Sequence, residues 1–141
     1  MRPGPSSQAA SERLRAVARR DTPPEMGLRR ELHRVGMRYV VHRRPLPELR
    51  READVVFPKA RVAVFVDGCF WHGCPTHGTY PASNGAWWRA KLDANVARDR
   101  DTDRRLRLAG WSVVRVWAHE PAPVAALRVR RAVCSRRALI R

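Results

Sequence analysis

Acidic, thiol and imidazole side chains are concentrated in the segment FVDGCFWHGCPTH, residues 65–77. They are Asp67, Cys69, His72, Cys74 and His77. The segment overlaps the end of an alternating apolar run, VAVFV at residues 62–66, which predicts a buried strand. Loops at strand ends often carry the chemistry of α/β proteins, because the strand holds the loop rigid while the loop stays accessible. We therefore expect the functional site at the end of this strand.

Three of these side chains have the types and spacing of zinc ligands. Cys69, Cys74 and His77 lie close together in the sequence, and His119, just after the last predicted strand, is the candidate fourth ligand. Four protein ligands would make the zinc structural rather than catalytic. The alternative is that the two Cys are buried thiols and His77 is a surface residue. Cys134 stands among apolar and Arg residues and is predicted to be buried.

Two acidic residues form a second candidate constellation. The segments ADVVF at 53–57 and RVAVFV at 61–66 predict two strands in hairpin register. Asp54 begins the first strand and Asp67 follows the second, so antiparallel pairing brings the two carboxylates to one edge. Magnesium prefers such hard oxygen ligands. The alternative is a solvated or capping role for an Asp at the edge of a strand.

The chain is strongly basic. Lys and Arg number 29 against 13 Asp and Glu, which gives a formal net charge of +16. Nucleic acid is the expected partner of such a protein, although a GC-rich genome also raises the Arg content. The sequence has no apolar run that would span a membrane and no apolar segment of a secretion signal near its start. We therefore expect a cytoplasmic, nucleoid-associated protein with no membrane partner.

The order of predicted elements indicates the fold class. Residues 1–10 are predicted to be a flexible N-terminal tail, and residues 11–141 a single domain. The predicted elements are a basic helix at 11–20, a helix capped by Thr22 that ends near Val35, strands at 37–42, 53–57, 61–66 and 111–117, a helix from Ser83 or Asn84 to Leu108, and a last helix at 121–137. This order predicts an α/β domain with a mixed sheet of about four strands flanked by helices.

Several motifs together resemble the very-short-patch (Vsr) mismatch repair endonucleases. They are RDTPPE at 20–25, ADVVF at 53–57, FVDGCFWHGCP at 65–75, WWRAKLDANVARDR at 87–100 and GWSVVRVW at 110–117. The resemblance covers residues 11–137. It implies a restriction-endonuclease-like domain with a structural zinc site and magnesium-dependent hydrolysis of the phosphodiester bond. Such an enzyme nicks one strand of double-stranded DNA beside a T:G mismatch, which arises when 5-methylcytosine deaminates, and so begins very-short-patch repair.

The resemblance also implies roles for individual residues. Asp54 matches the principal magnesium ligand, and the carbonyl of Val66 matches the position that completes the metal shell. His72 matches the catalytic histidine and would act as general base on the attacking water. Glu25 matches an acidic residue that supports hydration of the metal, but a helix-capping role fits the sequence equally well. Asp67 stands where well-known members have a histidine, so it would add a second carboxylate to the magnesium shell or only form the turn.

Aromatic and polar side chains match the positions that contact DNA at the mismatch. Phe70, Trp71 and Trp88 match aromatics that wedge into the duplex, and a mispaired step is easier to unstack than a matched one. Core packing is the alternative for both Trp residues. Lys91 and Asn95 are one helical turn apart and are expected to face the same way as Trp88.

Two other functions fit the sequence. One is a nuclease of the same fold that cuts at a sequence or a modified base. The other is a non-catalytic, zinc-stabilised module that binds nucleic acid. We expect a monomer that acts on T:G-containing duplex DNA, with other mismatch-repair proteins as possible partners.

Overall fold

The computed structural model describes residues 21–68 and 85–140. The predicted tail at 1–10, the predicted basic helix at 11–20 and the residues proposed to cap the long helix lie outside this part of the chain.

One mixed sheet of four strands organises the described residues. The strands are β1 (Val40–Arg43), β2 (Ala53–Phe57), β3 (Val62–Asp67) and β4 (Ser112–Trp117). They lie in the order β1-β2-β3-β4; β1 and β3 are antiparallel to β2, and β4 is parallel to β3. The predicted mixed sheet is therefore confirmed. Its topology brings the start of β2 and the ends of β3 and β4 to one edge.

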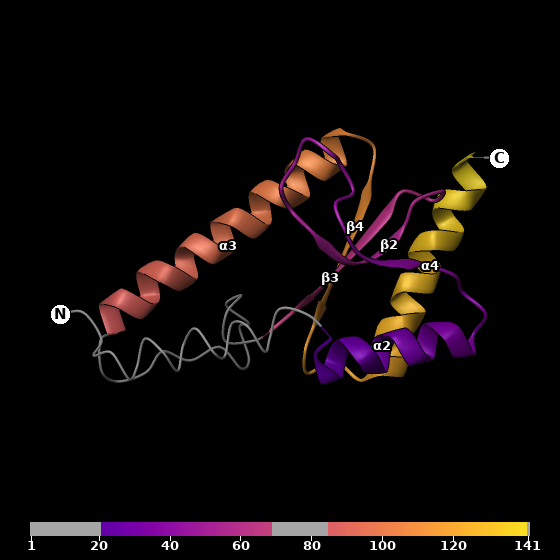
Figure 1. The fold of residues 1–141 in the computed structure, drawn as a ribbon, viewed down its shortest axis with the longest axis horizontal. Helices are drawn as coiled ribbons and strands as arrows, with labels where there is room; N and C mark the ends of the chain where they lie inside the picture. Colours follow the sequence, from indigo (N-terminus) through magenta and orange to yellow (C-terminus); the bar gives the residue numbers. More distant parts are fainter. Residues whose placement is uncertain (1–20, 69–84, 141) are drawn as a thin grey trace.

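Helices cover both faces of this sheet. Helix α2 (Pro23–Arg34) and helix α4 (Ala122–Ile140) lie together on one face, whereas α3 (Gly85–Leu108) approaches the other only near its carboxyl end (Figure 1). The apolar cluster on the first face includes Leu28, Leu32, Val55, Val64, Val129 and Val133. The cluster on the second face includes Val56, Ala63, Phe65 and Leu106. Burial on both faces explains why the central strands read as nearly continuous apolar runs.

Local signals account for the position of α2. The Thr22 hydroxyl accepts a hydrogen bond from the backbone N–H of Glu25 at 3.4 Å, as expected of an N-cap. Two Pro residues occupy the first helical positions, where no N–H is needed. Gly36 follows the helix with φ of +80°, a conformation that only glycine adopts without strain. The predicted cap and end of this helix are confirmed.

Several local predictions differ from the structure. The last strand, β4, begins at Ser112 rather than Trp111, and it is the outermost strand of the described sheet rather than a central one. The first strand begins at Val40 rather than Met37, because Met37 packs into the apolar cluster beside α2 and α4. Arg61 belongs to the turn before β3, with φ of +56°. Helix α4 continues to Ile140, beyond the predicted end. Cys134 is exposed rather than buried, because it follows Val133, which occupies the buried face of α4, and so points away from the sheet.

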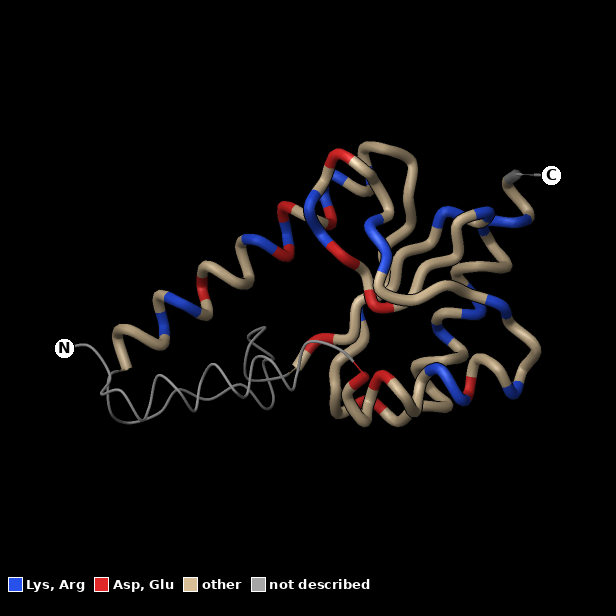
Figure 2. The backbone as a smooth tube through the Cα atoms, viewed as in Figure 1, with Lys and Arg blue, Asp and Glu red and all other residues tan. Residues whose placement is uncertain are grey.

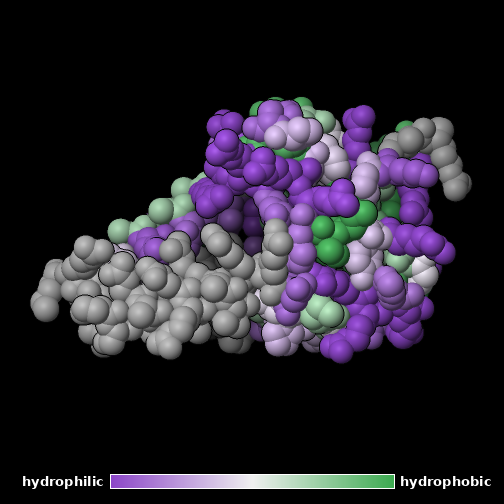
Figure 3. Space-filling model, viewed as in Figure 1, coloured by the Kyte–Doolittle hydropathy of each residue, from purple (hydrophilic) through white to green (hydrophobic). Residues whose placement is uncertain are grey.

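The surface is predominantly polar and charged. Lys and Arg are spread over the helices and not confined to one element (Figure 2). The face shown in Figure 3 is mostly hydrophilic, with small separate hydrophobic areas. Among the described residues, no helix has the length and apolar content needed to cross a lipid bilayer.

Candidate active site

Asp54 is held at the edge of the sheet by a backbone contact from the neighbouring strand. Its Oδ2 atom accepts a hydrogen bond of 2.7 Å from the N–H of Val66. The contact exists because antiparallel pairing of β2 and β3 places the start of one strand beside the end of the other. Asp54 and Val66, which were predicted to share a magnesium ion, are therefore adjacent.

The surroundings of Asp54 oppose its negative charge. Burial is the main cause, and it raises the pKa of the Asp54 carboxyl to about 7. The hydrogen bond from Val66 and the charge of His42 act in the opposite direction, while the negative charges of Glu25 and Asp67 raise the pKa further. A carboxylate in such a place is stabilised by a cation, and the oxygen donors at this edge fit magnesium.

Glu25 lies near Asp54 and is held by a cation from its own helix. Its buried carboxylate accepts a hydrogen bond of 2.7 Å from Arg29 Nη2, one helical turn further along α2. The same nitrogen lies 2.8 Å from Asp21 Oδ1 and 2.9 Å from His42 Nε2. Among the described residues, the Glu25 carboxylate thus contacts Arg29 and His42 rather than the backbone of the helix cap.

Asp21, Glu25 and His42 also form a group whose possible metal-ligating atoms all lie within 4.8 Å of one another. Arg29 Nη2 contacts one such atom of each of them, so its guanidinium group already supplies positive charge to this group. Arg29 is therefore well placed to balance the charge of Glu25 beside Asp54. The i to i+4 spacing of Glu25 and Arg29 was the signal in the sequence for this pair.

Asp67 is turned toward a partly buried arginine. Both of its carboxylate oxygens accept hydrogen bonds from Arg115 Nη1 of β4, at 3.0 and 3.2 Å. Arg115 also contacts Asp103 of α3, so this ion pair lies on the α3 side of the sheet. The second magnesium carboxylate at Asp67 stays a prediction, and in that role Asp67 would have to share its oxygens with Arg115.

The predicted DNA-contacting residues of α3 lie in its first turns. Trp88 is 9% exposed and its ring packs edge-on against that of Trp87 at 4.6 Å between centroids. Lys91 places its ammonium group 5.4 Å from the centre of the Trp87 ring, and Asn95 is half-buried. Insertion of Trp88 into a duplex would therefore require it to leave a packed position.

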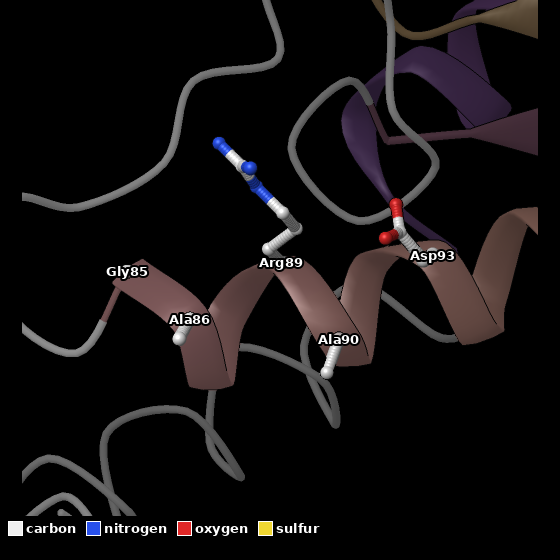
Figure 4. A pocket seen from close by; sticks show the side chains of 5 residues that line it. All are labelled: Gly85, Ala86, Arg89, Ala90 and Asp93. Atoms are coloured by element: carbon white, nitrogen blue, oxygen red, sulfur yellow. The ribbon is translucent and has the colours of Figure 1, made fainter.

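A groove runs beside the same turns of α3. Its described lining residues are Gly85, Ala86, Arg89, Ala90 and Asp93. Arg89 and Asp93 extend to one side of the helix, and the small side chains of Ala86 and Ala90 to the other (Figure 4). These residues share one face of α3, with the charged pair along one border of that face and the two Ala residues along the other (Figure 4).

Comparison with known proteins identifies the family. The family model for the DNA mismatch endonuclease Vsr matches residues 6–77, which is half of the chain. The type II nicking enzyme V.NaeI of Lentzea aerocolonigenes is 43% identical over 120 residues, which cover 84% of this chain and 72% of the length of V.NaeI. The chain belongs to the Vsr family.

Other Vsr relatives fall under two descriptions. The type II nicking enzyme V.XorIIP of Xanthomonas oryzae is 39% identical, over 83% of this chain and 85% of its own length. The DNA mismatch endonuclease Vsr of Escherichia coli is 37% identical, over 76% of this chain and 67% of its own. The family relationship therefore supports an endonuclease that acts on DNA, and the predicted resemblance is confirmed.

Several predicted residues of this Vsr chain lie outside the described part. They are Cys69, Phe70, Trp71, His72, Cys74 and His77. His119 is described: it is exposed in the turn after β4. In that turn the N–H of Ala118 donates to the carbonyl of Asp67 at 2.9 Å. His119 therefore lies near Asp67, the last residue of β3, and Asp67 precedes Cys69 by two residues in the sequence. This position fits the predicted fourth zinc ligand.

Three residues of the site were not predicted. Arg29 and His42 surround Glu25, and Arg115 binds Asp67. The signal for Arg115 was available, since a charged residue within the apolar run VVRVW stands among buried neighbours and needs a partner. Nothing in the sequence indicated His42, which meets α2 only through the tertiary fold.

Proposed function

We propose that this protein is a magnesium-dependent endonuclease that nicks one strand of duplex DNA beside a T:G mismatch formed by deamination of 5-methylcytosine. The observation that carries the proposal is the partly buried Asp54 carboxylate at the edge of the sheet, bound to the N–H of Val66 and close to Glu25. Membership of the Vsr family and the excess of basic residues support DNA as the substrate.

The residues at this edge suit one magnesium ion. Asp54 and the Val66 carbonyl would hold it, with Glu25 orienting water nearby. When bound, the ion would polarise the scissile phosphate and lower the pKa of a coordinated water. Arg29 holds the Glu25 carboxylate in place beside Asp54. His72 would accept the proton of the attacking water, as the family resemblance implies.

Mismatch recognition would come from the aromatic side chains. Phe70, Trp71 and Trp88 would enter the duplex where the mispaired bases are least stacked, and Lys91 and Asn95 would contact the mismatch or its phosphates. Unstacking costs a few kcal/mol and least at a mismatch, so we expect T:G duplexes to be nicked about 10²-fold faster than paired ones.

The second candidate is a nuclease of the same fold that recognises a sequence rather than a mismatch. It is favoured by the description of several relatives as type II nicking enzymes. The same catalytic edge would serve both functions, because the phosphate chemistry does not depend on how the site is found. Only the residues that meet the bases would differ in role.

Nicking of matched duplexes distinguishes the candidates. The duplexes would differ only in one central pair, T:G, C:G or T:A, between randomised flanks, and the nicked strands would be sequenced. We expect cleavage of the T-containing strand of the T:G duplex, with magnesium only. Equal cleavage of paired duplexes within a common sequence would support the second candidate. Binding without cleavage of any duplex would indicate a non-catalytic module. The Asp54→Asn variant is the matched control.

We also propose one structural zinc ion bound by Cys69, Cys74, His77 and His119. We expect about one equivalent of zinc in the purified protein, because four such ligands complete a tetrahedral site. Elemental analysis of the protein and of a Cys69→Ala, His119→Ala variant checks this. The matched control is Cys134→Ala, since Cys134 is exposed on α4. Full zinc in the double variant, or less than about half an equivalent in the natural sequence, would contradict the assignment.

A further inference from the structure

Arg115 makes several charged contacts from β4, the outermost strand on one side of the described sheet. Its guanidinium group donates to both oxygens of Asp67 and to Asp103 Oδ1, the latter at 2.7 Å. It also lies 3.4 Å from Asp99 Oδ1, and its central carbon is 4.1 Å from the centre of the Phe65 ring. The side chain is only 21% exposed. One cation thus faces three carboxylates and an aromatic ring.

These contacts join α3 to the end of β3. Asp99 and Asp103 are one turn apart on α3, and Asp67 is the last residue of β3. Without Arg115 the three carboxylates would lose this cation between them and would repel one another across the joint. Burial by itself would lower the pKa of Arg115, but the hydrogen bond to Asp103 and the negative charges of Asp67 and Asp99 outweigh it, and the pKa is raised. The guanidinium group therefore stays charged.

Few other described contacts fix α3 to the sheet. Leu106 reaches the apolar cluster on this face, and Thr102 accepts a hydrogen bond of 2.6 Å from Arg51. The α3 residues in these contacts lie in the carboxyl-terminal part of the helix, while its amino-terminal part extends away from the sheet (Figure 1). The Arg115 contacts are thus the charged part of a joint at one end of a long helix.

The length of α3 makes this joint sensitive. At 1.5 Å per residue, Trp88 is about 22 Å from Asp103 along the helix axis. A tilt of about 3° at the joint would move the first turns of α3 by about 1 Å. Misplacement of about 1 Å between a substrate and a catalytic group can cost about 10²-fold in rate.

We propose that Arg115 and Asp103 are positioning residues that set the angle between α3 and the catalytic end of β3. The inference rests on the proposed function, since it takes the first turns of α3 to contact DNA and Asp54 to act on the phosphate. Through this joint, the position of the bound base pair and the position of the scissile phosphate are fixed relative to each other. The side chain of Asp103 fits this role because Arg115 Nε and Nη2 both donate to it.

Two variants at Asp103 test the joint without altering a predicted magnesium ligand. Asp103→Ala removes the contact to Arg115, whereas Asp103→Asn keeps one oxygen that accepts a hydrogen bond in nearly the same shape. The matched control is Arg104→Ala, which removes a charged side chain of α3 that is 68% exposed and pairs with Asp101 of the same helix. Arg115→Lys keeps the charge but loses the planar fork of donors.

Two measurements separate positioning from stabilisation. Single-turnover nicking of a T:G duplex is measured well below the melting temperature of every variant, where all are folded and a merely stabilising contact has no effect. We expect Asp103→Ala and Arg115→Lys to nick about 10–10² times more slowly, Asp103→Asn to recover part of the rate, and Arg104→Ala to stay within about twofold. Residual dipolar couplings of backbone amides report the angle of α3 to the sheet in the free protein.

The couplings also keep this inference separate from the proposed function. If the natural sequence nicks no T:G duplex, the proposed function fails, yet a changed α3 angle in Asp103→Ala, with Arg104→Ala unchanged, still supports the joint. An α3 angle that is identical in Asp103→Ala, Arg115→Lys and the natural sequence would overturn the inference, whatever the nicking rates. Unchanged nicking by folded Asp103→Ala would overturn it equally.

Discussion

Replacement of Asp54 by Ala is expected to abolish nicking and to leave the affinity for DNA nearly unchanged. Asp54 is bound to the Val66 N–H, and its burial opposes its negative charge. Its loss removes the proposed magnesium ligand and, with it, both activation of the phosphate and the lowered pKa of the water. DNA affinity depends mainly on the many basic side chains and should change little. Single-turnover nicking and binding of the same T:G duplex measure the two effects.

Two further variants make this result specific. Asp54→Asn keeps an oxygen that accepts the hydrogen bond from Val66, so loss of nicking by this folded variant would be due to the lost charge. His72→Ala should only slow nicking, by about 10²–10⁴-fold, because a general base contributes in that range. Robust cleavage by either Asp54 variant would refute the proposed active site.

The stability of the metal-free protein is expected to fall as the pH rises through about 7. Burial raises the pKa of Asp54 from 3.8 to about 7 in the folded protein. Between these two values the folded protein binds more protons at Asp54 than the unfolded chain, so the free energy of unfolding decreases with increasing pH. A difference of about three pKa units corresponds to roughly 4 kcal/mol over the whole range, of which roughly 3 kcal/mol falls above pH 5. Urea unfolding at about pH 5 and about pH 8, without divalent ions, measures the change.

Magnesium should reverse this trend. The ion would bind the ionised carboxylate, so it should stabilise the protein more at about pH 8 than at about pH 5. Asp54→Asn is the control, because it cannot ionise and should show little pH dependence in this range and little stabilisation by magnesium. If the natural sequence and Asp54→Asn show the same pH dependence, another group is responsible and the raised pKa of Asp54 is wrong.

The sequence by itself determined the elements whose signals are local. The Thr22 cap and Gly36 mark α2, because both act within one or two turns of the helix. The apolar run at residues 53–57 predicted β2 to the residue, because buried strands carry a nearly continuous apolar pattern. The edge that unites Asp54 and Val66 also followed from hairpin pairing and from the family motifs. The start of β1 was predicted at Met37 rather than Val40 because Met37 is apolar, but its side chain packs in the apolar cluster outside the strand.

Only the tertiary structure decided which partners the charged groups have. Asp67 and Arg115 are far apart in the sequence and meet because β3 and β4 pair in parallel, and Asp103 joins them because α3 returns to the same face of the sheet. His42 reaches Glu25 because β1 passes beside α2. Charged side chains carry no periodic signal for such encounters, and whether a carboxylate binds an arginine or a metal depends on what the fold brings within about 3 Å of it.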